Sequence, residues 1–400
     1  MERIYMDHSA TTPVSERALE AMLPWFREEF GNPSAIYSYG QTGKNILEDC
    51  RKRMAECLGA LQTEICFTSG GTESDNWAIR GACRSRGARG RHIITSAIEH
   101  NAVLRTLAQM EEDGFEVTYL QPDARGHITP AQLEAAIRPD TILISIMLAN
   151  NVVGTVLDIP ALSRVAAAHR IWFHTDAVQA VGHIPIRVRQ LGVDFLSLSA
   201  HKFGGPKGVG ALYCRLPNRL PPILTGGGQE KGLRSGTENI PGIVGMTAAL
   251  EESVGELPEE SARLAELRDR LIRGACAIPG VRLTGDAENR LPGFASFLVE
   301  DIGHSVHLVN ALNEKGICVS SGSACSAASR EASHVLLALG YDQKSAAGSL
   351  RVTLGRSNTP QQVERLLSLL PQTIAELRRE AKKEPAVTFR RPDRELDEDE

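Results

Sequence analysis

The chain has 400 residues, of which 42% are hydrophobic and 23% charged, and its formal net charge is −5. This composition excludes a disordered or fibrous protein, and the length suffices for one large core and a second, smaller domain. The weak negative charge gives no general attraction to phosphate backbones or acidic membranes. We therefore expect an enzyme acting on a small molecule, with no direct nucleic-acid or membrane partner.

Nothing in the sequence indicates secretion or a membrane span. The first residues lack a basic region followed by an apolar one, and no stretch approaches the roughly 20 apolar residues of a spanning helix. Eight cysteines without a C-x-x-C pair predict neither a disulfide framework nor a zinc site. We expect a cytoplasmic protein that binds no metal.

From residue 64 onward, short apolar runs alternate with longer amphipathic or alanine-rich stretches. This alternation predicts an α/β fold with a mainly parallel seven-stranded sheet covered by helices. The expected strands are 64–68, 92–96, 116–120, 141–147, 172–176, 194–199 and 210–214. Ligands of such sheets bind at the carboxyl ends of the strands, where most of the candidate functional residues stand.

The pattern changes near residue 257, where a charged helix over 259–277 is followed by mixed strands and a helix over about 360–382. We expect residues 257–383, joined by 1–15, to form a smaller α/β domain, and residues 16–256 to form the large domain. The tail 384–400 is rich in Arg, Asp and Glu, and this composition predicts disorder.

A glycine-rich segment, Ser69-Gly70-Gly71-Thr72, follows the first expected strand and opens a helix. Backbone N–H groups of this turn and the Thr72 hydroxyl could hold a phosphate at the positive end of the helix. An ordinary glycine turn with a threonine cap explains the same residues, so this segment alone does not decide.

Two ionisable residues, Asp176 and Lys202, each end an apolar run that reads as a buried strand. A pyridoxal phosphate site needs a lysine for the Schiff base and an acid that keeps the pyridine nitrogen protonated. The alternatives are an aspartate in a salt bridge or a helix cap, and a lysine whose ammonium reaches solvent. Lys207, in a glycine-rich loop, is the rival Schiff-base lysine.

Eight segments resemble, in order, the signatures of the cysteine desulfurases, over about residues 3–380. Among them are Met-Asp-His-Ser-Ala-Thr-Thr at 6–12 and Ser-Gly-Ser-Ala-Cys-Ser within 320–326. The others lie at 68–76, 99–100, 150–151, 174–179, 199–210 and 226–239. The resemblance implies the type I fold of pyridoxal phosphate-dependent transferases and pyridoxal 5′-phosphate as the cofactor.

The resemblance also implies roles for single residues around that cofactor. Lys202 would form the Schiff base, Asp176 would pair with the pyridine nitrogen, and His100 would stack on the ring and move protons. Asn151 and Gln179 would bond the pyridoxal O3′.

Further residues would hold the phosphate and the substrate. The phosphate would be bound by Gly71, Thr72, Ser199 and His201, joined by Thr237 from a neighbouring subunit. The last role implies a homodimer. Arg356 would grip the carboxylate of the substrate L-cysteine, together with Asn151, because a guanidinium binds a carboxylate in two places.

Cys325 matches the cysteine that attacks the substrate sulfur and forms a persulfide, for which a thiolate is the reactive form. The family default is then delivery of sulfur to an iron–sulfur scaffold protein, while a thiolation enzyme for tRNA, a cofactor or DNA is another possible recipient. A selenocysteine lyase or a cysteine β-lyase on the same scaffold would not need Cys325 or would release pyruvate.

One departure from the family pattern bears on activity. Val152 stands where the family usually has glutamate after two asparagines. The loss of this carboxylate motivates a third alternative, a weakly active subunit that serves as a sulfur-transfer scaffold.

Overall fold

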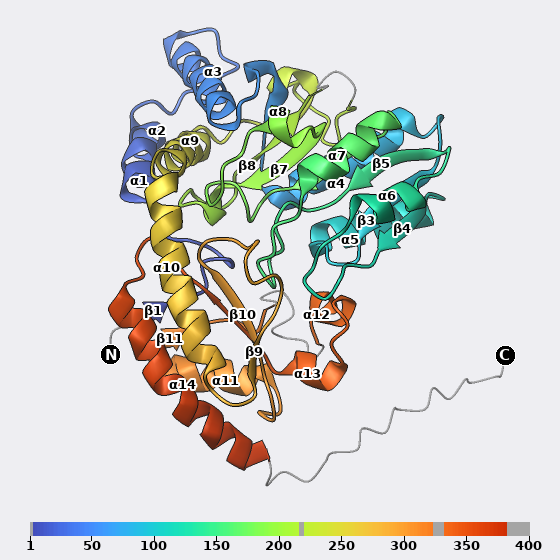
Figure 1. Ribbon diagram of the computed structural model, residues 1–400. Coiled ribbons are helices and arrows are strands. Elements are labelled where there is room, and N and C mark those ends of the chain that lie inside the picture. Colours follow the sequence, from blue (N-terminus) through green and yellow to red (C-terminus); the bar gives the residue numbers. More distant parts are fainter. Residues whose placement is uncertain (1–2, 216–219, 323–331, 382–400) are drawn as a thin grey trace, which may run out of the picture.

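The computed structural model describes residues 3–215, 220–322 and 332–381 (Figure 1). Its centre is a seven-stranded sheet with the order β2-β8-β7-β6-β5-β3-β4. The strands are β2 (Ile65–Thr68), β3 (His92–Ser96), β4 (Glu116–Leu120), β5 (Thr141–Ser145), β6 (Trp172–Asp176), β7 (Phe195–Ser199) and β8 (Gly210–Cys214). All seven expected strands are confirmed within two residues at each end. Glu64 falls outside because it closes a short 3-10 helix, where its carboxylate accepts the Leu61 N–H at 2.9 Å.

One strand runs against the other six. β8 pairs antiparallel with both β2 and β7, whereas β3, β4, β5, β6 and β7 pair in parallel. Gly210, the first residue of β8, therefore faces Thr68 on one side and Ser199 on the other. A Cβ atom at Gly210 would lie 2.6 Å from the Gly70 Cα, so only glycine permits this close approach.

Alternate side chains of the strands pack into two cores on opposite faces of the sheet. Phe173 and Leu196 belong to the core beneath one set of helices, and their neighbours Trp172 and Phe195 belong to the core of the other face. The first set includes α3 (Ser38–Leu58), α7 (Ile159–Ala168), α8 (Val188–Leu191) and α9 (Ile240–Gly255); the second includes α4 (Gly71–Arg86) and α5 (Asn101–Glu112). The result is a three-layered α/β/α arrangement.

A second region, lower in Figure 1, has its own sheet and its own apolar core. β9 (Val281–Leu283), β10 (Phe294–Val299) and β12 (Ser349–Thr353) form an antiparallel sheet against α10 (Leu257–Cys276), α11 (Ser305–Glu314) and α14 (Pro360–Ala381). β1 (Ile4–Tyr5), at the start of the chain, pairs in parallel with β11 (Ile317–Cys318) of this region. The domain boundaries themselves stay a prediction.

The remaining helices are short. They are α1 (Glu16–Met22), α2 (Pro24–Arg27), α6 (Pro130–Ala136), α12 (His334–Ala338) and α13 (Gln343–Ala347). Among the described residues, none of the helices combines the length and apolarity needed to cross a membrane.

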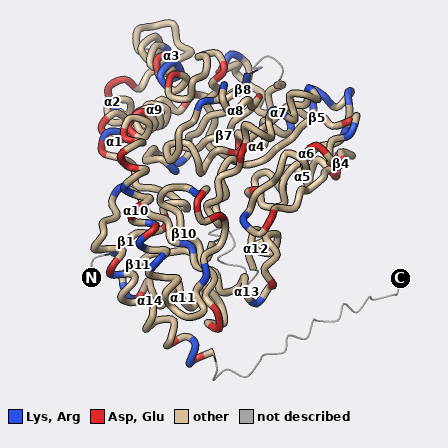
Figure 2. Tube along the Cα trace, in the orientation of Figure 1, with Lys and Arg blue, Asp and Glu red and all other residues tan. Residues whose placement is uncertain are grey.

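Charged residues lie mostly on helices and loops, and the strands of the large sheet are nearly free of them (Figure 2). Within those seven strands, only Glu116 and Asp176 carry a charged side chain of the Asp, Glu, Lys or Arg type. Glu116 is exposed on an edge strand, but Asp176 is buried at 6% exposure. A buried carboxylate at a strand end is costly unless it meets a cation or hydrogen-bond donors, so Asp176 marks a functional position.

Candidate active site

A cavity of about 530 Å³ opens at the carboxyl edge of the large sheet. It collects residues from the ends of β2, β6 and β7, from the start of α5 and from β12 of the second region. Nine of the predicted residues line it together: Gly71, Thr72, His100, Asn151, Asp176, Gln179, Ser199, His201 and Lys202. The arrangement explains why residues far apart in the sequence can serve one ligand.

The glycine turn at one end of the cavity can receive an anion. Gly70 has φ +152°, a conformation that favours glycine, and α4 begins at the next residue. The first amides of a helix have no acceptor within the helix and point outward, which gives the turn a positive end. Glu73 stabilises the turn by accepting the Ser69 N–H at 2.7 Å and pairing with Arg234 at 2.8 Å.

Asp176 lies in a cluster of three titratable groups. Oxygen atoms of Asp176 and Asp75 and a ring nitrogen of His100 all lie within 4.8 Å of one another. Burial raises the pKa of Asp176, and the neighbouring Asp75 carboxylate raises it further. A protonated ring nitrogen of a ligand would supply the missing cation and return Asp176 to its ionised form.

His174 lies next to Asp75 of that cluster. Burial raises the pKa of Asp75 to about 7 and lowers the pKa of His174 to about 4, and the two side chains are 3.5 Å apart. His174 also bonds the hydroxyls of Ser145 at 2.8 Å and Ser197 at 3.0 Å. The neutral forms of Asp75 and His174 are therefore favoured, whereas Asp176 beside them can carry a charge.

His100 caps α5 and faces the cavity. Its Nδ1 accepts the Ala102 N–H at 3.1 Å, and burial lowers its pKa. A neutral imidazole that accepts at Nδ1 carries its proton on Nε2. His100 can therefore give or take a proton at one defined atom.

Lys202 follows β7 and extends its ammonium into the cavity. Its Nζ donates to the backbone oxygen atoms of Ser9 at 2.5 Å and Ala10 at 3.0 Å. The rival Lys207 also lines the cavity, but Lys207 is exposed. The backbone contacts hold the Lys202 amine in the cavity that Asp176 also lines, which favours Lys202 as the residue that meets a ligand.

Two orphaned polar atoms indicate that the cavity is shaped for a polar ligand. Within the described part of the chain, Asn151 Oδ1 and Arg351 Nε are buried and have no hydrogen-bond partner. Both residues line the cavity. Arg351 otherwise donates to the backbone oxygen of Asn151 at 2.8 Å and pairs with Asp7 at 2.8 Å. Together with the glycine turn and Asp176, these atoms fit a phosphorylated pyridinium and a carboxylate.

Two predicted residues do not join this group. Arg356 lines a different cavity and pairs with Glu252 at 3.1 Å and Glu256 at 3.2 Å, whereas Arg351 lines the first cavity. The reason is that Arg351 lies within β12, which faces the site, whereas Arg356 lies beyond the end of that strand. Thr237 is exposed and does not line the cavity.

Cys325 lies outside the described residues, as does the acidic tail. Val152 is described, lines the cavity at 2% exposure and packs with Ile98, Val335 and Leu336. Position 152, where the family usually has a glutamate, is thus occupied by an apolar side chain that packs in a hydrophobic cluster.

Sequence reasoning missed Ser9, Asp75, His334 and Arg351, all of which line the cavity. Arg351 had a usable signal, since an arginine in a strand of otherwise apolar or small residues demands a partner. Asp75 also had one, because it lies one helical turn after the glycine segment and therefore on the same side of the helix start. Ser9 and His334 offered no pattern of their own.

The sequence matches the family Aminotransferase class-V over residues 4–366. It is 52% identical to "Cysteine desulfurase IscS" of Methanosarcina thermophila over 94% of this chain and 93% of that protein. The chain belongs to the cysteine desulfurases of the class-V aminotransferases. This membership implies pyridoxal 5′-phosphate as the cofactor and confirms the family resemblance.

Two solved structures of this family agree with the fold. A "NIFS-LIKE PROTEIN" superimposes with a TM-score of 0.88 at 39% identity, covering 94% of this chain and all of that one. The structure titled "SspA in complex with cysteine" has a TM-score of 0.79 at 40% identity, covering 88% of this chain and 98% of that one. The predicted type I transferase fold is confirmed.

Proposed function

We propose that this protein is a cysteine desulfurase that converts L-cysteine to L-alanine and retains the sulfur as a persulfide on Cys325. The observation that carries the proposal is the single cavity in which Asp176, Lys202 and the glycine turn meet. The cysteine bound in the SspA structure supports the same substrate class.

The cofactor would be held at both ends. Gly71, Thr72, Ser199 and His201 would bind its phosphate, and Lys202 would join it covalently. Asp176 would pair with the ring nitrogen, while Gln179 and Asn151 would bond the ring hydroxyl. When bound, pyridoxal phosphate stabilises the negative charge that develops at the substrate α-carbon.

The substrate would be oriented by Arg351 and Asn151. Arg351 lines the cavity, its Nε has no hydrogen-bond partner among the described residues, and a carboxylate is the acceptor that a guanidinium prefers. Lys202 and His100 would move the protons of the reaction: both line the cavity, and His100 also belongs to the cluster with Asp176. Burial keeps His100 neutral, as a proton carrier near neutral pH requires.

The sulfur step would use the thiolate of Cys325. As the S–S bond forms, the C–S bond of the substrate breaks and its electron pair stays with the carbon fragment. That fragment takes up protons and leaves as L-alanine. The persulfide then passes to an acceptor protein in the cytoplasm, by default a scaffold for iron–sulfur assembly, or to a thiolation enzyme.

We further propose a homodimer in which Thr237 reaches the phosphate of the other subunit. Thr237 is exposed rather than directed into its own cavity. Large apolar side chains are also exposed between residues 19 and 39, among them Phe26 at 58%, Phe30 at 67% and Ile36 at 92%. A patch of this kind is typical of a protein–protein contact.

The experiment that tests the activity is the release of alanine and sulfide from L-cysteine with a thiol reductant, for the wild type and for Cys325→Ala. Equal molar products from the wild type and none from the variant support the desulfurase. Pyruvate and ammonia would indicate a β-lyase. With L-selenocysteine as the substrate, selenide release that persists in the variant would indicate a selenocysteine lyase. Bound cofactor without turnover would favour the scaffold alternative.

A further inference from the structure

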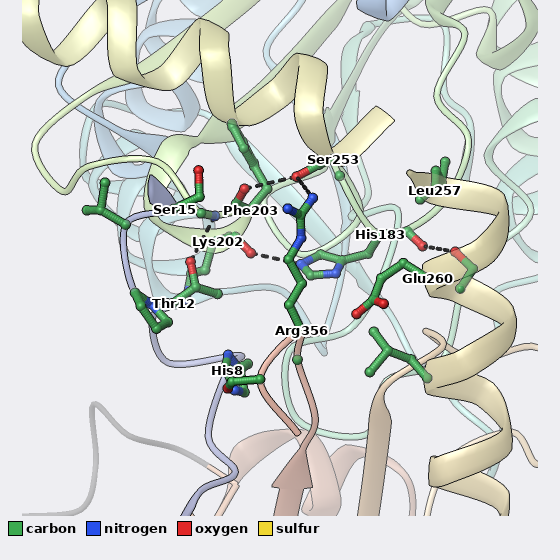
Figure 3. A pocket seen from close by; sticks show the side chains of 18 residues that line it. His8, Thr12, Ser15, His183, Lys202, Phe203, Ser253, Leu257, Glu260 and Arg356 are labelled. Atoms are coloured by element: carbon green, nitrogen blue, oxygen red, sulfur yellow. Dashed lines mark hydrogen bonds between the residues drawn. The ribbon is translucent and has the colours of Figure 1, made fainter. Parts of the chain in front are cut away.

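A second cavity, of about 170 Å³, also has Lys202 in its wall (Figure 3). Lys202 lines both cavities, since its ammonium reaches Ser9 in the first while its backbone faces the second. The walls of the second cavity come from residues 12–15, from α9 and α10, and from residues 355–357 after β12. Lys202 and the segment that follows Arg351 therefore line the same cavity.

Two side chains of this cavity hold the backbone next to the reactive amine. His183 Nε2 bonds the backbone oxygen of Lys202 at 2.8 Å, and the Ser253 hydroxyl donates to the backbone oxygen of Phe203 at 3.0 Å. A carbonyl oxygen can only accept, so His183 must carry a proton on Nε2. Burial lowers the pKa of His183 and so favours the neutral ring, which leaves this single proton on Nε2.

Arg356 braces this arrangement from the opposite side of the cavity. In Figure 3 its side chain crosses the cavity toward Ser253, and its Nη2 donates to the Ser253 oxygen at 3.3 Å. The serine hydroxyl has one proton, which it gives to Phe203, so the arginine supplies the donor that its oxygen can still accept. Glu252 and Glu256 hold the guanidinium at 3.1 and 3.2 Å.

The backbone of the Arg356 loop is fixed in turn. Arg263 of α10 donates to the backbone oxygen atoms of Gly355 at 3.2 Å and Asn358 at 2.7 Å. Arg351, which lies five residues before Arg356, lines the first cavity. The short segment 351–358 thus contains Arg351, the candidate substrate-binding residue, and Arg356, which contacts the side chains that hold the Lys202 backbone.

We propose that His183, Ser253 and Arg356 are positioning residues that set the reach of Lys202 toward the cofactor. They hold the two carbonyl groups that follow the Lys202 and Phe203 Cα atoms, and Arg356 ties this support to the strand that carries Arg351. The inference rests on the proposed function, because it assigns Lys202 as the residue that joins the cofactor. It replaces the direct substrate role predicted for Arg356 with an indirect one.

The test compares Arg356→Leu, Ser253→Ala and His183→Leu with the wild type. One readout is the affinity for added pyridoxal phosphate, and another is the pH midpoint of the colour change of the lysine-bound cofactor. The third is a comparison of the change in kcat with the change in KM for alanine formation. Each variant should weaken cofactor binding about fivefold, the value of one hydrogen bond, and shift the pH midpoint. The kcat should fall while the KM for cysteine stays within about twofold.

Two controls keep the test specific. Arg53→Leu removes an arginine of α3 that pairs at 2.6 Å with Glu251 of α9, the helix that also carries Ser253. Arg53 does not line the second cavity, so this variant should leave all three readouts unchanged. His183→Gln keeps a donor and should restore most of the cofactor affinity that His183→Leu loses.

The outcomes separate this inference from the proposed function. Variants that match the wild type in affinity and pH midpoint would overturn the positioning role while leaving the desulfurase intact. A large rise in KM for Arg356→Leu alone would restore its direct role at the substrate. A wild type that binds no pyridoxal phosphate would overturn both proposals.

Discussion

Arg51 and Glu230 form a buried, two-pronged ion pair in which both nitrogen–oxygen distances are 2.7 Å. Their side chains are 5% and 3% exposed. Glu230 also accepts the backbone N–H of Phe67 at 2.9 Å, within the strand that leads to the glycine turn, and it has a positive φ of +48°. The pair thus fastens the segment before Thr237 to the strand that leads to the glycine turn.

Removing one partner of this pair should lower the free energy of unfolding far more than removing both charges. Arg51→Met should lower the free energy of unfolding by about 3–5 kcal/mol, because it leaves the Glu230 carboxylate buried without a cation. Adding Glu230→Gln removes that charge and keeps an acceptor for Phe67, so the double variant should recover part of the loss. Urea denaturation measures both, and a double variant less stable than Arg51→Met would contradict the explanation.

Arg351 should control substrate affinity. Arg351→Ala should lower kcat/KM for L-cysteine by about 10- to 100-fold, mainly through KM, since a charge-assisted hydrogen bond contributes about 1.5–3 kcal/mol. Because Arg351 also pairs with Asp7, cofactor affinity and melting temperature must be followed in parallel. The assignment fails if KM is unchanged, or if the loss of activity follows stability alone.

The cofactor-free protein should become less stable as the pH rises through the neutral range. Burial raises the pKa of Glu99 from 4.5 to about 8, so the folded state keeps a proton that the unfolded chain has lost. Between these values, stability falls by about 1.4 kcal/mol per pH unit for such a group.

Glu99→Gln mimics the protonated form and should flatten this dependence, gaining stability relative to the wild type as the pH increases. Asp75, with a pKa raised to about 7, and Asp176 contribute with the same sign. Buried histidines such as His174, whose pKa is lowered to about 4, contribute with the opposite sign below about pH 6.5, so a residual pH dependence remains in the variant. Thermal melts of the cofactor-free proteins from about pH 5 to about pH 8 check this. Parallel pH profiles for variant and wild type would exclude Glu99 as the source.

Val152 should matter for packing more than for chemistry. Val152→Ala should lower the free energy of unfolding by about 1–3 kcal/mol, through lost burial and the cavity left behind. Alanine formation by the folded variant should stay within about twofold. Val153→Ala is the matched control, because Val153 belongs to the same apolar cluster but does not line the site. A selective loss of activity in Val152→Ala would assign that side chain a part in turnover.

The sheet could be predicted because its strands are continuous apolar runs separated by stretches long enough for helices. The ends of β3, β4, β6 and β8 match the expected ranges. The positions of Asp176 and Lys202 at strand ends then placed them on one edge of the sheet, and the cavity contains both.

The choice between Arg351 and Arg356 could not be made from the sequence. Both flank the end of one strand, and residue type alone does not tell which faces the site. The answer depends on tertiary contacts. Arg356 forms ion pairs with Glu252 of α9 and with Glu256 at the end of that helix, outside the first cavity. Arg351 lies on β12 where this strand lines the first cavity. For the same reason the backbone oxygen of Ser9, distant in sequence, was not recognised as a partner of Lys202.

The antiparallel strand β8 sets a fixed span across the site. Gly210 stands between Thr68 and Ser199, so the glycine turn and the lysine segment leave the sheet two strand spacings apart, about 10 Å. This separation is defined by backbone hydrogen bonds and not by the side chains of either loop. Residues in the two loops can therefore change in evolution or by design without altering the distance that the cofactor must bridge, whereas Gly210 cannot.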